Sequence, residues 1–517
     1  MIIVLDFGGQ YCHLIARRIR DLGVYSEILP YNIDLNLLKK KEADGIILSG
    51  GPSSVYERNS PQISETLFKF IISEKIPILG ICYGFHLIIH QLGGKIQSKD
   101  DKEYGKTDLT ILEQDLLFDS LETNQIVWMS HGDQVIELPH GFKKLAKTSN
   151  CPIAAYRDDK NKIFGVQFHP EVTNTPNGMK ILENFTFKIA RCKKEWKLKD
   201  WIKKSIEIIR KIVENEDKVI LGLSGGVDSS VTAILLHKAI GDRLHCIFVN
   251  NGLLRKNEET NVQKTFKDKL GFRNFHYVNA EDIFLEKLKS IEDPEEKRKI
   301  IGHTFIEVFE EKTFEIEREF PNIRYLAQGT IYPDRVETAA TSNATAKIKS
   351  HHNVTLPEDM KLELIEPLKD LYKDEVRKLG LELGLPEEMV YRHPFPGPGL
   401  AVRCIGPVTK DRLDTLREAD RILIEEIKKA GLYRNLWQIF CVLIPVKTVG
   451  VMGDYRTYEY ICSIRAVESL DAMTANFAKL DWDLLEKIGT RIINEVKGFN
   501  RVVYDISNKP PSTIEYE

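Results

Sequence analysis

The sequence predicts an α/β protein: two open domains with mostly parallel sheets, followed by a smaller α+β domain. Short runs rich in β-branched residues alternate with helical patterns through most of the chain, as parallel sheets require. The Pro- and Gly-rich stretch 393–399 cannot continue a helix or a strand, so it marks a boundary. A chain of 517 residues has room for about three domains. We therefore expect domains at 1–192, 193–393 and 394–517.

The elements of the first two domains follow from that alternation. In the first domain we expect a helix over Phe85–Leu92 and strands at Ile2–Leu5, Gly45–Leu48, Ile76–Ile81 and Ile163–Phe168. The lysine-rich segment Lys193–Lys211 has apolar residues at near-helical spacing, which favours a linker helix with solvated charges over a functional basic patch. In the second domain we expect strands at Val219–Leu223, Leu244–Val249, Phe275–Asn279 and Tyr325–Gln328. A ligand of this domain should bind at the carboxyl ends of those strands.

The third domain has a different pattern. Asp411–Ala430 is predicted to form one long helix. Strand-like runs follow at Trp437–Ile444 and Tyr458–Ile464, then a helix near Trp482–Lys497 and a last strand at Arg501–Ile506. This order, a helix and then mixed strands, is typical of an α+β domain.

Composition excludes several classes of protein. The 73 Lys and Arg residues nearly cancel the 76 Asp and Glu residues, which argues against nucleic acid or a membrane surface as the main partner. No apolar run reaches the ~18 residues of a spanning helix, and the first residues read as a strand rather than a signal peptide. The eight cysteines never form C-x-x-C pairs, so neither a zinc ribbon nor a disulfide framework is predicted. We expect a protein of the cytoplasm.

A phosphate-binding loop is predicted between the strand Val219–Leu223 and the helix pattern after it. Two adjacent glycines let backbone N–H groups approach an anion, and the N-terminus of the helix favours negative charge. The loop lacks the lysine of a Walker A motif, so it is not built to transfer a γ-phosphate. An ordinary glycine-rich turn is the simpler alternative. The residues expected to form this phosphate cradle, to which the family resemblance described below assigns the phosphates of ATP, are Ser224, Gly225, Gly226, Val227, Asp228, Ser229 and Ser230.

A second chemistry is predicted in the first domain, where Gly80–Gly84 follows an apolar strand and precedes a helix. This is the setting of a nucleophile elbow, with Cys82 in place of a serine. A thiol becomes a useful thiolate when a helix N-terminus and an imidazole favour the anion. His169 at the end of another predicted strand supplies the imidazole, and Glu171 can orient its ring.

An oxyanion hole is expected beside this cysteine. The glycine pair in Leu48–Pro52 follows a predicted strand, and the N–H of Gly51 can act with that of Tyr83 on a developing negative charge. Taken one by one, the alternatives are a buried cysteine, a hydrogen-bonded histidine and a glycine turn. Their joint occurrence favours a catalytic site.

These residues resemble the class I glutamine amidotransferase family, which releases ammonia from glutamine with a Cys-His-Glu triad. The resemblance implies that Ser130, His131 and Asp133, in the segment Trp128–Asp133, help to hold the amino acid end of glutamine. One departure lies four residues after the cysteine, where the family usually has glutamine and this chain has His86. We expect His86 to contact the substrate, and we hypothesise a weakened or partner-gated glutaminase.

The loop Ser224–Ser230 resembles that of the ATP pyrophosphatase superfamily, which cleaves ATP between its α and β phosphates. Both halves together resemble the GMP synthetase family, and the resemblance covers the whole chain. It implies a class I amidotransferase domain, a Rossmann-like ATP pyrophosphatase domain and a C-terminal domain that dimerises and helps to bind xanthosine monophosphate (XMP). The segments that carry it are Phe248–Glu258, Glu296–Gly302, Ala327–Asp334, Ile348–Asn353, His393–Leu400 and Asn508–Glu515.

Further site residues are implied by this second resemblance. Asp228 would also bind Mg²⁺, and Lys369 and Lys373 are weaker candidates for phosphate contacts. Asn250 stands where the family usually has aspartate, and His351–His352 would belong to a lid segment rather than a metal site, because adjacent strand residues face opposite ways. The residues expected to bind XMP are Arg298, Pro396, Lys509 and Glu515; without the resemblance, Arg298 would read as part of a solvated helix face.

The resemblance implies a reaction in which ATP adenylates the C2 oxygen of XMP and ammonia then displaces AMP. Its substrates would be XMP, ATP and glutamine, its cofactors ATP and Mg²⁺, and its assembly a homodimer. Two alternatives remain open at this point. One is another adenylating amidotransferase, for NAD, asparagine or tRNA modification; such enzymes lack the C-terminal third seen here. The other is a regulatory or scaffold protein whose glutaminase half has decayed through His86.

Overall fold

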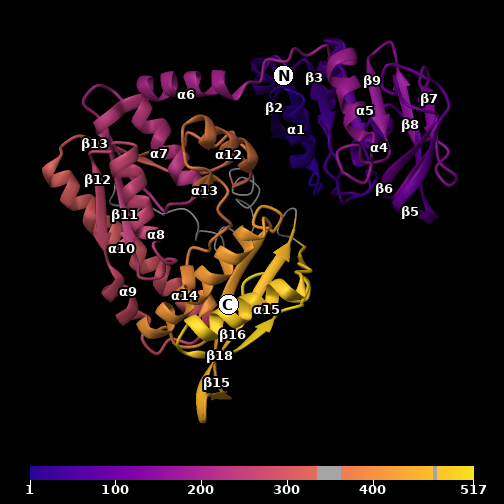
Figure 1. Ribbon diagram of the computed structural model, residues 1–517. Coiled ribbons are helices and arrows are strands. Elements are labelled where there is room, and N and C mark those ends of the chain that lie inside the picture. Colours follow the sequence, from indigo (N-terminus) through magenta and orange to yellow (C-terminus); the bar gives the residue numbers. More distant parts are fainter. Residues whose placement is uncertain (335–361, 470–473) are drawn as a thin grey trace. The chain divides into compact units, whose positions relative to one another are not determined.

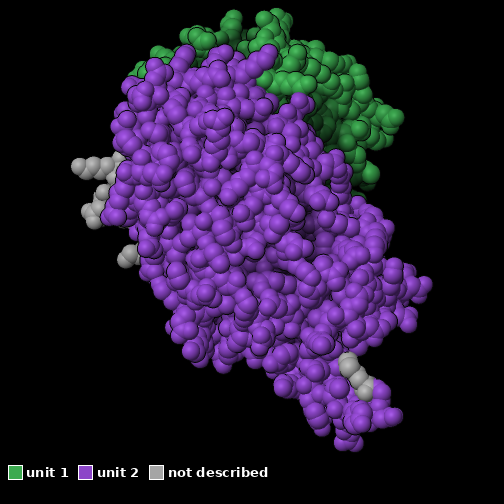
Figure 2. All heavy atoms as spheres, turned by 60° about the vertical axis from the view of Figure 1, so that its left-hand side comes forward, with its two compact units in different colours: residues 1–201 green, residues 202–517 purple. Residues whose placement is uncertain are grey.

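The computed structural model describes residues 1–334, 362–469 and 474–517 (Figure 1). The chain forms two compact units, residues 1–201 and 202–517, which Figure 2 distinguishes by colour. The boundary between them falls within helix α6 (Leu198–Ile212), which overlaps most of the segment expected to be a linker helix. The division of the chain into three domains stays a prediction.

The first unit is built on one sheet of nine strands, ordered β2-β1-β3-β4-β9-β8-β7-β5-β6. The strands from β2 to β9 are parallel to one another, and those from β9 to β6 pair antiparallel. All four strands expected here are present. The strands are β1 (Ile2–Asp6), β2 (Ser26–Pro30), β3 (Gly45–Leu48), β4 (Ile78–Ile81), β5 (Lys95–Ile111), β6 (Asn124–Glu137), β7 (Lys143–Lys147), β8 (Ala155–Asp158) and β9 (Ile163–Val166).

Helices cover this sheet and complete its core. The central strands β1, β3, β4 and β9 are buried along almost their whole length, because the helices exclude water from both faces of a parallel sheet. The antiparallel strand β6 instead alternates buried and exposed residues along most of its length. The helices are α1 (Cys12–Asp21), α2 (Leu35–Lys40), α3 (Glu65–Ser73), α4 (Tyr83–Gln91) and α5 (Gly178–Asn184), which runs into a π-helical turn at Phe185–Ile189.

The second unit begins with a fully parallel sheet of five strands, ordered β12-β11-β10-β13-β14. Its strands are β10 (Lys218–Gly222), β11 (Leu244–Asn250), β12 (Phe275–Asn279), β13 (Ile323–Ala327) and β14 (Glu363–Ile365), the last not foreseen from the sequence. Its helices are α7 (Val227–Ile240), α8 (Glu258–Gln263), α9 (Glu281–Lys287), α10 (Pro294–Glu319), α12 (Lys373–Glu382) and α13 (Glu387–Val390).

The C-terminal part of this unit has helices α14 (Lys410–Lys429) and α15 (Trp482–Glu495) beside a small mixed sheet. That sheet contains β15 (Gln438–Met452), β16 (Tyr455–Glu468), β17 (Asn476–Phe477) and β18 (Phe499–Tyr504). The hairpin of β15 and β16 is longer than expected and extends beyond the rest of the sheet in Figure 1. One core cluster runs from Ile220 to Phe499, so the two parts of the second unit share their hydrophobic interior.

The expected exclusions can be compared with the structure. Within the described residues, no helix is both long and apolar enough to cross a membrane. All eight cysteines are buried free thiols. The proposed lid segment with His351 and His352 lies outside the described residues.

Candidate active sites

The Cys82 site is built on the turn between β4 and α4. Cys82 has φ of 52°, in the left-handed region, and forms the N-cap of α4. The flanking glycines are required by packing, since a Cβ on Gly80 would lie 2.6 Å from the carbonyl oxygen of Gly84. A Cβ on Gly84 would in turn lie 2.4 Å from the carbonyl oxygen of Leu48. These close approaches require glycine on both sides of Cys82, and the cysteine lies at the tip of a tight turn.

His169 and Glu171 lie beside this thiol, just after β9. Nδ1 of His169 is 2.7 Å from Oε1 of Glu171, and both side chains are buried. Burial opposes a charge on the ring, but the charge of Glu171 and the hydrogen bonds with Cys82 and Glu171 outweigh it, so the pKa of His169 lies well above its ordinary value. The thiol of Cys82 also donates to the carbonyl oxygen of Ser130, with Sγ 3.6 Å from that oxygen. A cysteine thiol, an imidazole and a carboxylate are thus brought together, which is the set of groups that nucleophilic catalysis by a thiol requires.

The glycine pair expected to form an oxyanion hole approaches the same turn. A Cβ on Gly50 would lie 3.2 Å from Cε1 of His169 and 3.8 Å from Cβ of Cys82. A Cβ on Gly51 would lie 3.1 Å from Cγ of Tyr83, the first residue of α4. The N–H of a first helical residue has no partner within its own helix. Backbone N–H groups can therefore face an oxyanion formed at Cys82.

Three of the residues predicted to hold glutamine, Ser130, His131 and Asp133, lie on β6, and each has different surroundings. Ser130 presents its carbonyl to the thiol. The carboxylate of Asp133 accepts from the hydroxyls of Ser54 and Tyr56, at 2.5 and 2.7 Å. The side chain of His131 is buried between β5 and β6, where its Nε2 contacts Glu103 at 3.1 Å. Ser54, Tyr56 and Glu103 were missed in the sequence, because no motif or period connects them to Asp133 and His131.

His86 is buried on α4, one helical turn after Cys82. Burial, and then the charge of His131, lowers its pKa to about 4, so the ring is neutral near pH 7. Its Nε2 has no hydrogen-bond partner among the described residues. A neutral imidazole with one unused nitrogen can hydrogen-bond to an amide, as a glutamine side chain would.

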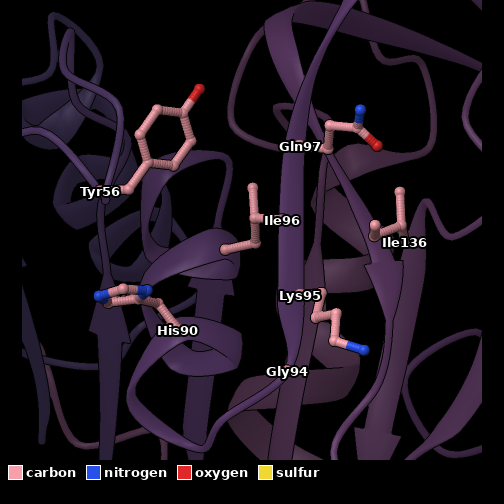
Figure 3. Close-up of a pocket in the computed structure, with 7 residues that line it drawn as sticks. All are labelled: Tyr56, His90, Gly94, Lys95, Ile96, Gln97 and Ile136. Carbon is pink, nitrogen blue, oxygen red and sulfur yellow. The ribbon is translucent and has the colours of Figure 1, made fainter.

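A shallow hollow of about 410 Å³ lies nearby, lined by residues of β5, β6, α4 and the loop with Tyr56 (Figure 3). Tyr56 and Ile96 face each other across it in Figure 3. The triad residues do not line it. Tyr56 connects it to the site, because its hydroxyl donates to Asp133.

The glycine-rich loop of the second unit connects β10 to α7, as expected, and the helix starts at Val227, within the loop motif. Gly225 has φ of +72°, and a Cβ there would lie 2.9 Å from Cγ2 of Val262. The hydroxyl of Ser229 accepts from the N–H of Ser224 at 3.2 Å, which closes the loop on itself. Ser230 is buried, and its hydroxyl has no partner among the described residues. The loop thus has the geometry of a helix N-terminus that can accept an anion.

Asp228 lies at the mouth of this loop and pairs with Lys373 from the start of α12. Only one carboxylate oxygen is used; Oδ1 is buried and lacks a hydrogen-bond partner within the described residues. Gly329 packs against this turn, since a Cβ on it would lie 3.1 Å from the backbone N of Ser229. The structure thus brings Lys373 to the loop, whereas Lys369 donates its backbone N–H to the carbonyl of Glu366 within its own turn.

Comparison with known proteins gives three family matches along the chain. Residues 3–189 match the class I glutamine amidotransferase family, 197–305 match NAD synthase, and 425–516 match the C-terminal domain of GMP synthase. Curated relatives named glutamine-hydrolysing GMP synthase match over 517 residues, 100% of this chain and 99% of each relative. The identity is 54% for Brachyspira hyodysenteriae, 55% for Carboxydothermus hydrogenoformans and 54% for Aquifex aeolicus. The chain belongs to the glutamine-hydrolysing GMP synthase family.

Two residues expected to bind XMP meet at the C-terminal segment of this GMP synthase family member. The carboxylate of Glu515 accepts two hydrogen bonds from Arg403, at 3.0 and 2.9 Å, and one from Gln438 at 2.6 Å. Arg298, on α10, donates to the backbone carbonyl of Glu517. The C-terminal segment therefore brings Arg298 and Glu515 to one region.

The other two candidates are less closely tied to that region. Gln438 also donates to the carbonyl of Pro394 at 3.1 Å, which brings the loop with Pro396 close to Glu515. Lys509 pairs through its backbone with Ala475, at the edge of the sheet. Arg403 and Gln438 were missed in the sequence, because an arginine after a turn and a glutamine in a strand have no distinguishing pattern.

The departure at Asn250 has a local explanation in the structure. Its Nδ2 donates to Oε2 of Glu259 at 2.6 Å, and its Oδ1 accepts from the N–H of Gly252 at 3.0 Å. An aspartate would place a second carboxylate against Glu259, and like charges at that distance repel. The amide is therefore the group that suits this neighbour.

Proposed function

We propose that this protein synthesises GMP from XMP, with ATP as the activating agent and glutamine as the nitrogen donor. ATP adenylates the C2 oxygen of XMP and releases pyrophosphate. Ammonia, released from glutamine together with glutamate, then displaces AMP. The observation that carries the proposal is the joining, in one chain, of the buried Cys82–His169–Glu171 arrangement and a lysine-free phosphate loop.

Glutamine hydrolysis is assigned to the first unit. Because Nδ1 of His169 is taken by Glu171, the other ring nitrogen is the one that receives the thiol proton. The thiolate of Cys82 attacks the side-chain amide, and the ring returns the proton to the departing ammonia. The N–H groups of Gly51 and Tyr83 stabilise the oxyanion, and water then hydrolyses the thioester. Ser130, Asp133 and His86 are proposed to hold the substrate, and His131 to act through the β6 segment that contains it.

Adenylation is assigned to the second unit. The loop Ser224–Ser230 would hold the phosphates of ATP through its N–H groups and hydroxyls. Asp228 suits Mg²⁺, because a hard cation prefers oxygen ligands and Oδ1 is not used by any hydrogen bond among the described residues. When bound there, Mg²⁺ would neutralise the charge that develops on pyrophosphate. Lys373 is proposed to contact the same phosphates, which its pairing with Asp228 supports.

XMP binding is assigned to the region around the C-terminal segment. The guanidinium of Arg298 suits an anionic group of the nucleotide, and the carboxylate of Glu515 can accept from ring N–H groups. Pro396 and Lys509 complete the proposed set. Glu515 is held by Arg403 and Gln438, so its oxygens are already oriented by two side chains from the same unit.

A homodimer formed through the C-terminal domain is also proposed, in the cytoplasm. The extended hairpin of β15 and β16 carries exposed apolar and aromatic side chains, including Val451 and Tyr455. Such side chains on a protruding hairpin are typical of a surface that another copy covers. Sedimentation of the wild type and of Val451→Lys tests this, with a monomeric variant as the expected result.

The proposed location in the cytoplasm is supported by the free thiols of all eight cysteines, which a reducing compartment maintains.

The deciding experiment measures GMP and AMP formation with XMP, ATP, magnesium and either glutamine or an ammonium salt. Cys82→Ala should abolish the glutamine reaction and keep the ammonium reaction, whereas Asp228→Ala should abolish both. Deamido-NAD and aspartate are each tested in place of XMP as alternative substrates, because residues 197–305 also match NAD synthase. Turnover of either one without turnover of XMP would refute the proposal, as would glutamine use by Cys82→Ala.

A further inference from the structure

We propose that Glu103 is a positioning residue for glutamine hydrolysis, which forms a buried ion pair with His131 and thereby fixes the β6 segment that faces Cys82. The inference rests on the proposed function of the first unit and adds a residue to it. It assigns to Glu103 no contact with substrate; its action passes through His131.

The contacts of His131 define the charge state of its ring. Glu103 on β5 lies directly opposite His131 on β6 in the strand register. Nε2 of His131 is 3.1 Å from Oε2 of Glu103, and Nδ1 is 2.9 Å from the carbonyl oxygen of Asp133. A backbone carbonyl and a carboxylate both accept hydrogen bonds, so each ring nitrogen must donate. The ring is therefore an imidazolium, paired with a carboxylate.

Both members of the pair are shielded from water, with side chains only 3% exposed. The second oxygen of Glu103 accepts from Oγ1 of Thr148 at 2.7 Å. Burial alone would raise the pKa of Glu103, but the hydrogen bonds from His131 and Thr148 outweigh it and the pKa lies below its ordinary value. A charged carboxylate thus faces a charged ring, and breaking such a pair leaves one buried charge uncompensated.

The pair is connected to the catalytic site at both ends of a short segment. Ser130, the residue before His131, presents its carbonyl to the thiol of Cys82. Asp133, two residues after, receives the Nδ1–H bond on its carbonyl, while its side chain is held by Ser54 and Tyr56. Movement of the His131 ring therefore moves the segment 130–133 against the thiol.

The same charge acts on His86, the residue at the unusual position after the cysteine. After burial, the charge of His131 is the next cause of the low pKa of His86, about 4. The ion pair at His131 thus helps to keep His86 neutral. A neutral ring is the form that can bind an amide without a competing charge.

The group formed by Glu103, His131 and Cys151 also has the composition of a metal site, since its ligand atoms lie within 4.8 Å of one another. Hydrogen bonds already account for these atoms. The thiol of Cys151 donates to the carbonyl of Ile153 at 3.2 Å, and Thr148 uses the other oxygen of Glu103. We therefore assign the group to a hydrogen-bond network, and metal analysis of the purified protein is part of the test.

The first test is spectroscopic and does not depend on activity. In full-length protein labelled with ¹⁵N-histidine, both ring nitrogens of His131, identified with His131→Gln, should carry a proton. In Glu103→Gln the proton on Nε2 should be lost, because the amide can donate to Nε2 where the carboxylate could only accept. A wild-type His131 ring with a proton on only one nitrogen would overturn the proposal. So would one equivalent of bound zinc whose removal abolishes glutamine use.

The second test is kinetic. Relative to wild type, kcat/KM for glutamine should fall about tenfold in Glu103→Gln and further in Glu103→Ala, while ammonium-dependent GMP synthesis stays unchanged. Glu113→Gln is the matched control, because Glu113 pairs with Arg157 in the same unit but at a 43% exposed position. Thermal unfolding of each variant shows whether a loss of activity comes from a displaced segment 130–133 or from an unfolded protein. A folded Glu103→Ala with the same kcat/KM for glutamine as the wild type would overturn the proposal. If the proposed function itself is wrong, the wild type would fail to use glutamine for GMP synthesis.

Discussion

Nδ1 of His169 lies 2.7 Å from Oε1 of Glu171, two residues further along the chain and beyond the end of β9. A contact this local holds the ring in one orientation, so the remaining ring nitrogen faces Cys82. The arrangement depends little on the rest of the fold. Only the approach of Cys82 requires tertiary structure, through the parallel pairing of β4 with β9.

Replacement of Glu171 by glutamine tests this orientation. The amide cannot stabilise the imidazolium of His169, so glutamine-dependent kcat should fall about 100-fold or more. Ammonium-dependent synthesis should be unchanged, and steady-state assays with both donors measure the two rates. Glu183→Gln, on α5, is the control for a neutral change on the same unit. Similar losses with both nitrogen donors would contradict the assigned role.

Replacement of His86 by glutamine tests whether this departure weakens the glutaminase. We expect a faster glutaminase rate, by up to about tenfold, the effect of about 1.4 kcal/mol in the transition state. Because the pKa of His86 is about 4, its ring stays neutral between pH 6 and 8. The gain should therefore be the same across that range. An unchanged rate would remove the hypothesis of a weakened site.

Replacement of Lys373 by methionine tests the second unit. Loss of the ammonium group that pairs with Asp228 should lower synthesis with glutamine and with ammonium alike, by about tenfold or more, because both require adenylation. Lys378→Met, an exposed position on the same helix α12, should behave as wild type. Pyrophosphate release without added nitrogen donor isolates the step. A defect confined to glutamine would argue against a phosphate contact.

Replacement of Gly84 by alanine tests the packing of the elbow. The added Cβ would meet the backbone of Leu48 at 2.4 Å, which cannot be relieved by a side-chain movement. We expect the first unit to lose about 1–3 kcal/mol of stability, measured by urea unfolding. At Gly132 the added Cβ would make only an ordinary contact with Lys102, at 3.5 Å, and stability should be retained. Equal stability of the two variants would refute the packing argument.

Acid should destabilise the second unit through two stacked histidines. Nδ1 of His245 is 3.1 Å from Nε2 of His276, and burial lowers the pKa of each ring to about 4. An unfolded histidine has an ordinary pKa near 6.5, so between about pH 6.5 and 4 the unfolded chain binds more protons. Stability contributed by the neutral pair is therefore present above pH 6.5 and lost as the pH falls towards 4. Urea unfolding at pH 7.5 and 5 should show a smaller pH effect in His245→Phe; an equal effect would exclude this pair as its cause.

Most of the regular structure was predictable because local pattern decides it. The strands at Gly45–Leu48 and Phe275–Asn279 were expected with the bounds that the structure has. Strand β14, only three residues long, was missed because its exposed residues give no buried run, and its pairing with β13 alone makes it a strand. Strands β5 to β8, in the antiparallel half of the first sheet, were likewise not predicted; of these, β7 and β8 have only five and four residues.

The sequence by itself determined the chemistry of both candidate sites. A cysteine between two glycines after a strand, and a glycine pair before a helix, are local motifs whose function depends on a few neighbouring residues. Only the tertiary structure decided which distant groups complete them: Glu103 for His131, Lys373 for Asp228 and Arg403 for Glu515. The physical reason is that ion pairs form wherever the fold brings opposite charges into contact, and in a chain rich in charged residues no pattern marks the few that meet.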